Sequence, residues 1–544
     1  MKHKDFNIMN KFPSVWGGGQ LIAFSGIDGQ TDFQNGLCLR TAFEKYVFQF
    51  KDGAYTPTPP VIRYAGSEVK NLELTGDFFR FYGEDGTVSS GVLPDSYHVL
   101  LDGDFSVELQ DKYDIAGKDG KMLIGRKGFF DPALLELDVE TEISKRAKFI
   151  ISAPVPENIS DAAHRTLLKA FSQIKTQTYA PEGRISCKWS TPDRWPHKRM
   201  WLWDSVFHAL GMRHIDVDIA RQFVSAMFDI QDESGLIPHS GNPIENHPSL
   251  TQPPVLSLAM RAINEQSPSP EWIAELAPKL ERYIEWIFAN RDSDGAGLVE
   301  WAIEANVNCR SGESGMDNSP RFDGAIQLDA PDFNAFLAYE CESLAMFIPE
   351  KRDYWMAHHD RLCKLMNERL WSDEVNLYVD YDVVANKRTD VMSSAGFLPL
   401  LCGAATPEQA AKMAAHLTDP ETFGTPFRVP SIARKNVAAY KKDMWRGPVW
   451  TNINYMIALG LERYGYHELA KSIVQDTLRE QEKFHLQFGT FFEFYDDRQE
   501  LPPPELERKG RMEDGSYHPF HQVFHDYGWS GTLYIEMLNR PEWR

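Results

Sequence analysis

The first 155 residues carry short runs of apolar or alternating residues, interrupted by Gly, Asp or Pro. This rhythm is typical of antiparallel strands, and so many short strands predict a β-sandwich over residues 1–155. The pairs Asp85-Gly86, Asp102-Gly103 and Asp119-Gly120 predict hairpin turns. The predicted strands are residues 20–25, 46–50, 61–64, 78–82, 97–101, 105–109, 134–139 and 148–152.

After Pro154-Val155-Pro156 the apolar residues recur at helical spacing. Twelve predicted helices make six helical hairpins, and repeated hairpins of this kind can close into a ring. The expected fold is mainly α, with an (α/α)6 toroid over residues 156–544 that follows the antiparallel β-sandwich. The predicted helices are residues 160–178, 203–213, 217–230, 254–264, 270–290, 332–347, 351–370, 392–402, 407–417, 449–463, 467–481 and 528–538.

The overall charge narrows the classes of partner. The 544 residues carry a net charge of −21, which argues against a nucleic-acid or anionic-membrane partner because phosphate contacts need a surplus of Lys and Arg. No apolar run follows the lysines of residues 1–5, so we expect a cytoplasmic location. The six cysteines form no C-x-x-C pair, which favours core thiols over a zinc site or disulfides. The sequence makes no prediction of oligomeric state.

The loop from Ser314 to Arg321 holds Asp317 among turn-forming residues. Gly312 and Gly315 permit backbone angles that other residues avoid, and Pro320 fixes the exit from the loop. The simplest interpretation is an Asx-turn in which Asp317 binds its own backbone. Because constrained loops also carry catalytic groups, Asp317 is a candidate catalytic residue.

Two segments combine tryptophans with a charged residue. Trp203 and Asp204 stand at a predicted helix entry, where the simple interpretation is a core aromatic cluster with Asp204 as N-cap. The alternative is a sugar site, in which indole rings stack on the sugar and Asp204 binds hydroxyl groups. Trp445, Arg446 and Trp450 repeat the combination, and a buried Arg446 needs a carboxylate or a ligand hydroxyl as partner.

A third segment places Glu493 between aromatic residues, an environment that desolvates a carboxylate. Its alternative is an exposed acid on a strand. These segments and Asp317 all lie near predicted element ends, which converge on one mouth in a helical ring. Carboxyl groups and tryptophans without a nucleophilic triad suit glycoside cleavage, in which one carboxyl protonates the leaving oxygen and another activates water.

The run from Asp292 to Gly297 is similar to half a calcium loop, because Asp292 and Asp294 occupy alternate positions. Ala296 stands at the third ligand position, and the expected glutamate is out of register. A tight turn is therefore favoured over a calcium site, and neither a metal nor another cofactor is expected.

Six motifs follow one another from about residue 190 to the C-terminus, and in them the chain resembles glycoside hydrolase family 63 and its relatives, which include processing α-glucosidases and mannosylglycerate or glucosylglycerate hydrolases. The resemblance implies an (α/α)6 catalytic domain that hydrolyses an α-glycosidic bond with inversion. It implies Asp317 as general acid and Glu493 as general base. The residues implied to line the sugar pocket are Trp203, Asp204, Gln252, Trp445, Arg446 and Trp450. The motifs are residues 203–205, 235–238, 252–254, 314–320, 445–452 and 492–495.

The favoured activity is an inverting, exo-acting α-glycosidase, with an α-glucoside or small oligosaccharide as the expected substrate. The alternatives among hydrolases are a trehalase-like enzyme and a mannosylglycerate or glucosylglycerate hydrolase. A toroidal sugar phosphorylase would need a phosphate cradle, which the helical region does not show in sequence. A non-catalytic carbohydrate-binding protein is the alternative outside enzymes, since sugar stacking does not require turnover.

Overall fold

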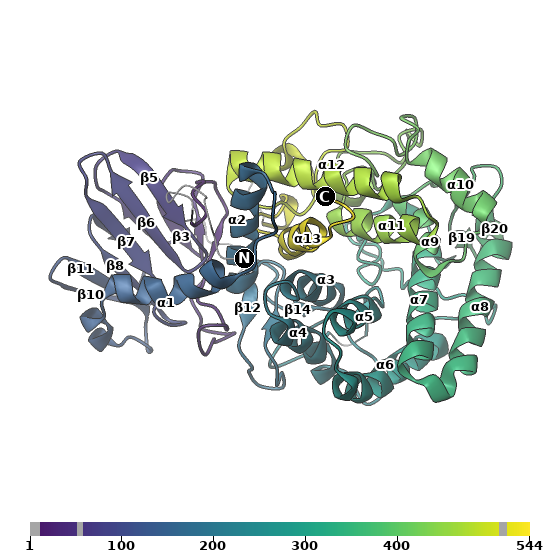
Figure 1. The fold of residues 1–544 in the computed structure, drawn as a ribbon, viewed down its shortest axis with the longest axis horizontal. Helices are drawn as coiled ribbons and strands as arrows, with labels where there is room; N and C mark the ends of the chain where they lie inside the picture. Colours follow the sequence, from purple (N-terminus) through teal and green to yellow (C-terminus); the bar gives the residue numbers. More distant parts are fainter. Residues whose placement is uncertain (1–10, 52–57, 248, 511–518) are drawn as a thin grey trace.

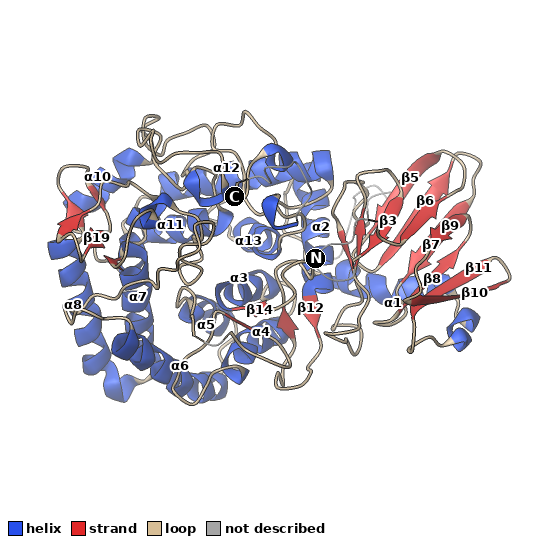
Figure 2. Cartoon of the chain, turned by 180° about the vertical axis from the view of Figure 1, so that it is seen from behind, coloured by secondary structure: helices blue, strands red, loops and turns tan. Residues whose placement is uncertain are grey.

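The computed structural model describes residues 11–51, 58–247, 249–510 and 519–544. It is mainly helical, with an antiparallel β-sheet region at its N-terminal end (Figures 1 and 2). The predicted fold class is confirmed at this level. Residues 1–5, which carry the N-terminal lysines, lie outside the described residues. Within the described ranges, no helix has both the length and the apolar character to span a bilayer.

The β-sheet region is built from two antiparallel sheets that share one buried cluster. One sheet contributes Phe48 and Ile62 to this cluster, and the other contributes Phe79 and Val99. The five-stranded sheet has the order β1 (Leu21–Ile22), β2 (Leu39–Thr41), β3 (Val47–Phe50), β4 (Val61–Tyr64) and β9 (Phe105–Glu108). The six-stranded sheet has the order β10 (Tyr113–Lys118), β11 (Lys121–Arg126), β8 (His98–Asp102), β7 (Val88–Val92), β6 (Phe78–Gly83) and β5 (Val69–Leu74).

Two of the three predicted hairpins are confirmed. Asp85-Gly86 connects β6 to its partner β7, and Asp119-Gly120 connects β10 to its partner β11. The hairpin predicted at Asp102-Gly103 is wrong, because β8 and β9 belong to different sheets. This turn carries the chain from one sheet to the other, and no local signal distinguishes the two kinds of turn.

The strands predicted at residues 134–139 and 148–152 are also wrong. This segment forms a 3-10 turn followed by helix α1 (Val139–Ser152). Asp138 caps the helix by accepting a hydrogen bond from the backbone N–H of Thr141. Val139, Ile143, Ala147 and Ile150 are buried at helical spacing along α1, so the apolar run at its C-terminal end belongs to one helical face and not to a strand.

The predicted helices are all present, with small shifts at their ends. Residues 392–402 form a 3-10 turn and a one-turn helix, and the helix that starts at His467 continues to Phe488. The helices are α2 (Asp161–Gln177), α3 (Leu202–Met212), α4 (Val217–Asp229), α5 (Leu256–Gln266), α6 (Pro270–Asn290), α7 (Pro331–Phe347), α8 (Arg352–Arg369), α9 (Pro399–Cys402), α10 (Pro407–His416), α11 (Thr451–Arg463), α12 (His467–Phe488) and α13 (Gly528–Asn539).

Alternate helices of the helical region contact one another in a closed circuit. Helices α3, α5, α7, α9, α11 and α13 contact one another in this order, and α13 contacts α3 again. Helices α2, α4, α6, α8 and α12 pack against this inner set from outside (Figure 1). The inner helices are rich in buried residues, which fits their position between the centre and the outer helices.

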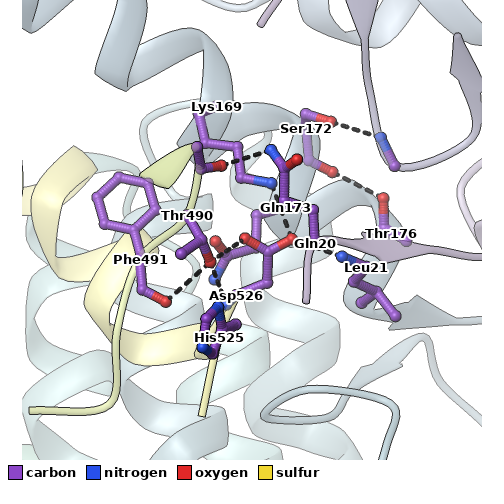
Figure 3. Close-up of polar contacts among 12 residues, drawn as sticks. Gln20, Leu21, Lys169, Ser172, Gln173, Thr176, Thr490, Phe491, His525 and Asp526 are labelled. Carbon is purple, nitrogen blue, oxygen red and sulfur yellow. Dashed lines mark hydrogen bonds and ion pairs between the residues drawn. The ribbon is translucent and has the colours of Figure 1, made fainter. Parts of the chain in front are cut away.

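Asp526 connects the β-sheet region to the helical region (Figure 3). Its buried carboxylate accepts hydrogen bonds from the Leu21 backbone N–H at 2.7 Å and from the Thr490 hydroxyl at 2.8 Å. The ammonium group of Lys169 in α2 lies 2.8 Å from the same carboxylate. Burial lowers the pKa of Lys169, and Asp526 opposes this shift. The ammonium group therefore depends on one carboxylate for its compensation.

Replacing Asp526 with alanine is expected to lower the free energy of unfolding by about 3 to 5 kcal/mol, because it leaves the Lys169 charge buried without a partner. Urea unfolding followed by circular dichroism measures this loss. Glu136→Ala removes an exposed salt bridge and serves as control, with a much smaller expected loss. Equal losses in the two variants would contradict the proposed role of the buried pair.

Candidate active site

One cavity of about 590 Å³ gathers side chains from loops and helix ends throughout the helical region. Seven of the eight predicted site residues line it, all except Arg446. Trp203 and Asp204 come from the first turn of α3, Gln252 from the segment before α5, and Trp450 from the residue before α11. The other three predicted residues that line the cavity are Asp317, Trp445 and Glu493. Trp445 lies in a short 3-10 turn, and Asp317 and Glu493 lie in loops between helices.

Tryptophan rings form one wall of this cavity. The rings of Trp445 and Trp450 stack at 3.8 Å between centroids, and Trp203 lies 6.2 Å from Trp445. Trp529, at the start of α13, contacts both Trp203 and Trp450 edge to face. Such flat, rigid surfaces suit the apolar faces of a sugar ring.

Gly315 fits this wall because it lacks a side chain. Its φ is +70°, and a Cβ there would lie 2.3 Å from the Trp203 ring. Both the backbone conformation and the close approach therefore require glycine.

Replacing Gly315 with alanine is expected to displace Trp203 and to lower kcat/KM by about 10- to 100-fold through misplacement of the sugar. Gly324→Ala is a matched control, since Gly324 has a φ of +72° but no atom within 4 Å of the added Cβ. Steady-state kinetics of both variants separates the contact from the backbone strain. Similar losses would exclude the Trp203 contact as the cause.

Asp317 points into the cavity from the loop that the sequence singled out. Its backbone carbonyl accepts a hydrogen bond from the Arg310 N–H at 2.8 Å, which closes the loop. Its Oδ2 lies 2.6 Å from the Nζ of Lys509. The neighbouring Cys309 thiol has a raised pKa because it is buried and faces the Asp317 charge. The carboxyl group therefore has an ammonium group on one side and a neutral thiol nearby.

Glu493 is held by a guanidinium group. The Nε of Arg508 donates to its Oε2 at 2.8 Å, and the second nitrogen donates to Oε1 at 3.2 Å. Arg508 also lies over the ring of Phe524 at 4.0 Å. Both Glu493 and Arg508 are buried, and their charges compensate each other. The sequence prediction that Glu493 lies in an aromatic, desolvated environment is confirmed.

Asp204 is a third carboxyl group in the cavity. Burial raises its pKa well above the usual range, and the nearby charges of Asp193 and Glu493 act in the same direction. Burial therefore favours the neutral form of Asp204 over the charged form. A neutral carboxyl group can both donate to and accept from sugar hydroxyls.

Arg446 does not line the cavity but binds the loop that carries Asp317. It donates to the Asn318 carbonyl at 3.0 Å and pairs with the carboxylate of Asp323. The Asn318 side chain in turn accepts from the Trp445 backbone N–H at 3.0 Å and donates to Asp443 at 3.1 Å. Arg446 therefore fixes the loop that carries Asp317, and Asp323 is the carboxylate partner that the sequence analysis required for it.

Several lining residues were not predicted from the sequence. They have no motif of their own, and they reach the cavity through loop conformation. Cys309 was expected to be a core thiol but borders Asp317, while the structure leaves all six cysteines free. A pattern that could have identified Trp529 is its place beside Tyr527 and Gly528 at a predicted helix start. Further unpredicted lining residues include Lys198, His239, Arg508, Lys509 and Tyr527.

Asp292, Asp294 and Glu300 lie apart from this cavity, and their carboxylate oxygens come within 4.8 Å of one another. Arg369 pairs with Asp294 at 3.0 Å, which supplies a positive charge to the cluster. Ala296 donates its backbone N–H to Asp294, as in the tight turn that was predicted. The turn is therefore present, and Asp294 has an arginine partner.

Comparison with known proteins gives consistent matches. Residues 196–530 match the sequence model of the mannosylglycerate hydrolase MGH1-like glycoside hydrolase domain. Mannosylglycerate hydrolase MGH1 of Selaginella moellendorffii is 25% identical over 457 residues, which cover 67% of this chain and 90% of that protein. Mannosyl-oligosaccharide glucosidase of Saccharomyces cerevisiae is 23% identical over 382 residues, which cover 55% of this chain and 45% of that protein.

Solved structures show the same fold. The crystal structure of the GH63 mannosylglycerate hydrolase of Thermus thermophilus in complex with glucose superposes with a TM-score of 0.55 at 24% identity. The match covers 68% of this chain and 98% of that one. It thus includes nearly all of the Thermus protein and leaves about a third of this chain unmatched.

Proposed function

This chain belongs to the mannosylglycerate hydrolase MGH1-like glycoside hydrolases of family 63, and we propose that it is an inverting, exo-acting α-glycosidase that cleaves a small α-mannoside or α-glucoside with an acidic aglycone. The observation that carries this proposal is the cavity itself, in which Asp317 and Glu493 reach a tryptophan-lined space from separate loops. Asp317 serves as general acid and Glu493 as general base.

The reaction uses the two carboxyl groups in opposite senses. Asp317 donates a proton to the glycosidic oxygen while the bond from this oxygen to the anomeric carbon breaks. A water molecule attacks the anomeric carbon from the other side and gives a proton to Glu493. Arg508 orients Glu493 through two hydrogen bonds and compensates its charge. The first product from an α-glycoside is then the β-anomer.

The charges at the mouth support an acidic aglycone. Lys198 lines the cavity, and its ammonium group contacts the Gln34 carbonyl and the Phe33 ring. It has no carboxylate partner among the residues that the structure describes. Lys509 lies beside Asp317, where the leaving group must be. Two relatives of this family are mannosylglycerate hydrolases, whose named substrate carries a carboxylate.

A second candidate is an α-glucosidase that acts on a neutral oligosaccharide. The yeast mannosyl-oligosaccharide glucosidase supports it, as does the sequence expectation of an α-glucoside. The tryptophan wall and the two carboxyl groups would serve this substrate equally well, so the choice between the candidates depends on the aglycone.

Proton NMR of the products tests the function directly. The substrates are α-mannosylglycerate, α-glucosylglycerate, α,α-trehalose and an α-linked glucose oligosaccharide. We expect turnover of one or both glycerate glycosides, with the β-anomer appearing first. Early α-anomer would contradict inversion, and turnover of the neutral oligosaccharide alone would favour the second candidate. Binding without turnover of the whole panel would favour a carbohydrate-binding protein.

The architecture that we propose for this activity is an (α/α)6 toroid over residues 156–544 behind a β-sandwich over residues 1–155. The circuit of inner helices from α3 to α13 supports the toroid. The shared buried cluster of the two sheets supports the sandwich. Loops at one end of such a ring meet in a single mouth, which accounts for the wide sequence spacing of the site residues.

A further inference from the structure

Arg508 and Lys509 are consecutive residues, and each pairs with one of the two proposed catalytic carboxyl groups. The Arg508–Glu493 pair is almost fully buried, with side-chain exposures of 3% and 2%. The Lys509–Asp317 pair is open to the cavity, with exposures of 18% and 20%. The first pair is therefore fixed, whereas a ligand in the cavity can reach the second.

The backbone of Lys509 is fixed although its side chain is accessible. Asp443 accepts hydrogen bonds from the backbone N–H of Lys509 at 2.7 Å and of Gly510 at 3.0 Å. Asn318, the residue after Asp317, donates to the same Asp443 carboxylate at 3.1 Å. Asp443 thus connects the backbone at Lys509 to the loop that carries Asp317. Its flexible four-carbon stem can still move the ammonium group between nearby oxygens.

The charge on Lys509 conflicts with the proposed role of Asp317. A general acid must carry a proton, whereas an adjacent ammonium group favours the ionised carboxylate. The charged or titratable groups that face Asp317 are Lys509, Cys309, His239 and Arg508. Burial lowers the pKa of His239 to about 3, so its ring is neutral near pH 7. The Cys309 thiol is neutral as well, and Arg508 is committed to Glu493.

Lys509 is therefore the exchangeable cation next to the acid, within the described part of the chain. In a glycoside of a 2-hydroxy acid, the carboxylate is attached to the carbon that bears the glycosidic oxygen. Because Asp317 must lie within hydrogen-bond reach of this oxygen, the substrate carboxylate lies close to the Nζ of Lys509. A neutral aglycone offers no charge at this position.

We propose that Lys509 makes the site selective for an acidic aglycone, because its ammonium group moves from Asp317 to the carboxylate of the substrate. This movement allows Asp317 to take up the proton that it later donates. We call this role of Lys509 the gate. This inference rests on the proposed function. Binding moves the ammonium group to the substrate carboxylate, and Asp317 accepts one proton from solvent. Asp317 then gives this proton to the glycosidic oxygen as its bond to the anomeric carbon breaks. Water supplies the new anomeric hydroxyl and gives one proton to Glu493.

The kinetic test compares two substrates that differ in one charge, α-mannosylglycerate and α-mannosylglycerol. We expect Lys509→Met to lower kcat/KM for the glycerate by about 100-fold, the order of effect of truncating one partner of a charge pair. The rate for the neutral glycerol compound stays level or rises, so the preference for the acid collapses. Lys509→Arg keeps the charge and part of the preference. Lys435→Met, at an exposed lysine, is the matched control for lost charge.

A binding test measures the proton itself. Calorimetric titration of the Glu493→Gln variant with D-glycerate, in two buffers of different ionisation enthalpy, gives the number of protons taken up. We expect about one proton per bound glycerate in this variant and none once Lys509→Met is added. Thermal unfolding of each variant verifies that it is folded, and Lys509→Gln replaces Lys509→Met if the latter is not.

The outcomes separate the gate from the proposed function. An unchanged preference for the acid in Lys509→Met, or proton uptake that does not depend on Lys509, overturns the gate while the glycosidase proposal stands. If no variant hydrolyses either substrate but uptake depends on Lys509, the exchange of Lys509 is supported and the proposed function fails.

Discussion

Replacing Glu493 with glutamine is expected to lower kcat by about 10²- to 10⁴-fold, the usual contribution of a general base. The amide keeps the size of the side chain and can still accept a hydrogen bond from Arg508. It cannot take a proton from water, and thermal unfolding of the variant separates this chemical loss from the cost of leaving Arg508 without its anionic partner. Stopped assays of sugar release, with each candidate glycoside as substrate, measure it.

The leaving group distinguishes the two carboxyl groups. Asp317→Asn should lose a similar factor with a natural aglycone, because the leaving oxygen then departs without a proton. With a glycosyl fluoride, which needs little protonation, Asp317→Asn should recover most of its rate, while Glu493→Gln should not. Glu265→Gln, at an exposed position of α5, controls for the amide substitution. An undiminished rate in either site variant would exclude that carboxyl group from catalysis.

Much of the helical region could be predicted because each helix carries its own apolar period. Helices α6 and α10 begin where Pro270 and Pro407 follow a serine or threonine, a strong start signal. The error at α1 has the same origin. The apolar runs before α1 and at its C-terminal end are short, and a short apolar run does not distinguish a strand from a helical face. Only the Asp138 cap and the spacing between the ends indicate a helix.

The candidate site could be predicted where a residue belongs to a motif, and not where it depends on loop conformation. Trp203, Asp317 and Glu493 stand in dense local patterns, and the structure brings all three to one cavity. Lys509 lies in a charged run, which on local evidence is an exposed turn. Its contact with Asp317 exists because Asp443 fixes the backbone at Lys509, an interaction across 66 residues. No spacing rule encodes such a contact.

For Arg446, the sequence predicted that a partner was needed but not which group it would be. The sequence required a partner for a buried arginine beside two tryptophans and left a carboxylate or a ligand hydroxyl open. The structure provides the carboxylate of Asp323. Composition thus predicts the need for compensation, whereas the direction of the side chain depends on tertiary packing.

Replacing Arg508 with methionine is expected to lower kcat/KM near pH 7 by about 100-fold or more and to destabilise the protein by about 3 to 5 kcal/mol. The change leaves the Glu493 carboxylate buried without its cation, with a backbone N–H of Phe524 at 3.5 Å as a remaining donor. A buried carboxylate in this situation favours its protonated form, which cannot act as a base.

The sign of the pH dependence follows from this loss of ionisation. Because the base must be ionised, the acid limb of the pH profile of kcat/KM should move to higher pH in Arg508→Met, and raising the pH should restore part of the rate. Arg508→Lys keeps the charge without the two-pronged contact, and its acid limb should lie between those of the two proteins. Arg479→Met removes an exposed arginine and should leave the profile in place. A uniform loss at every pH in Arg508→Met would instead mean that the guanidinium group acts on the shape of the cavity and not on the charge of the base.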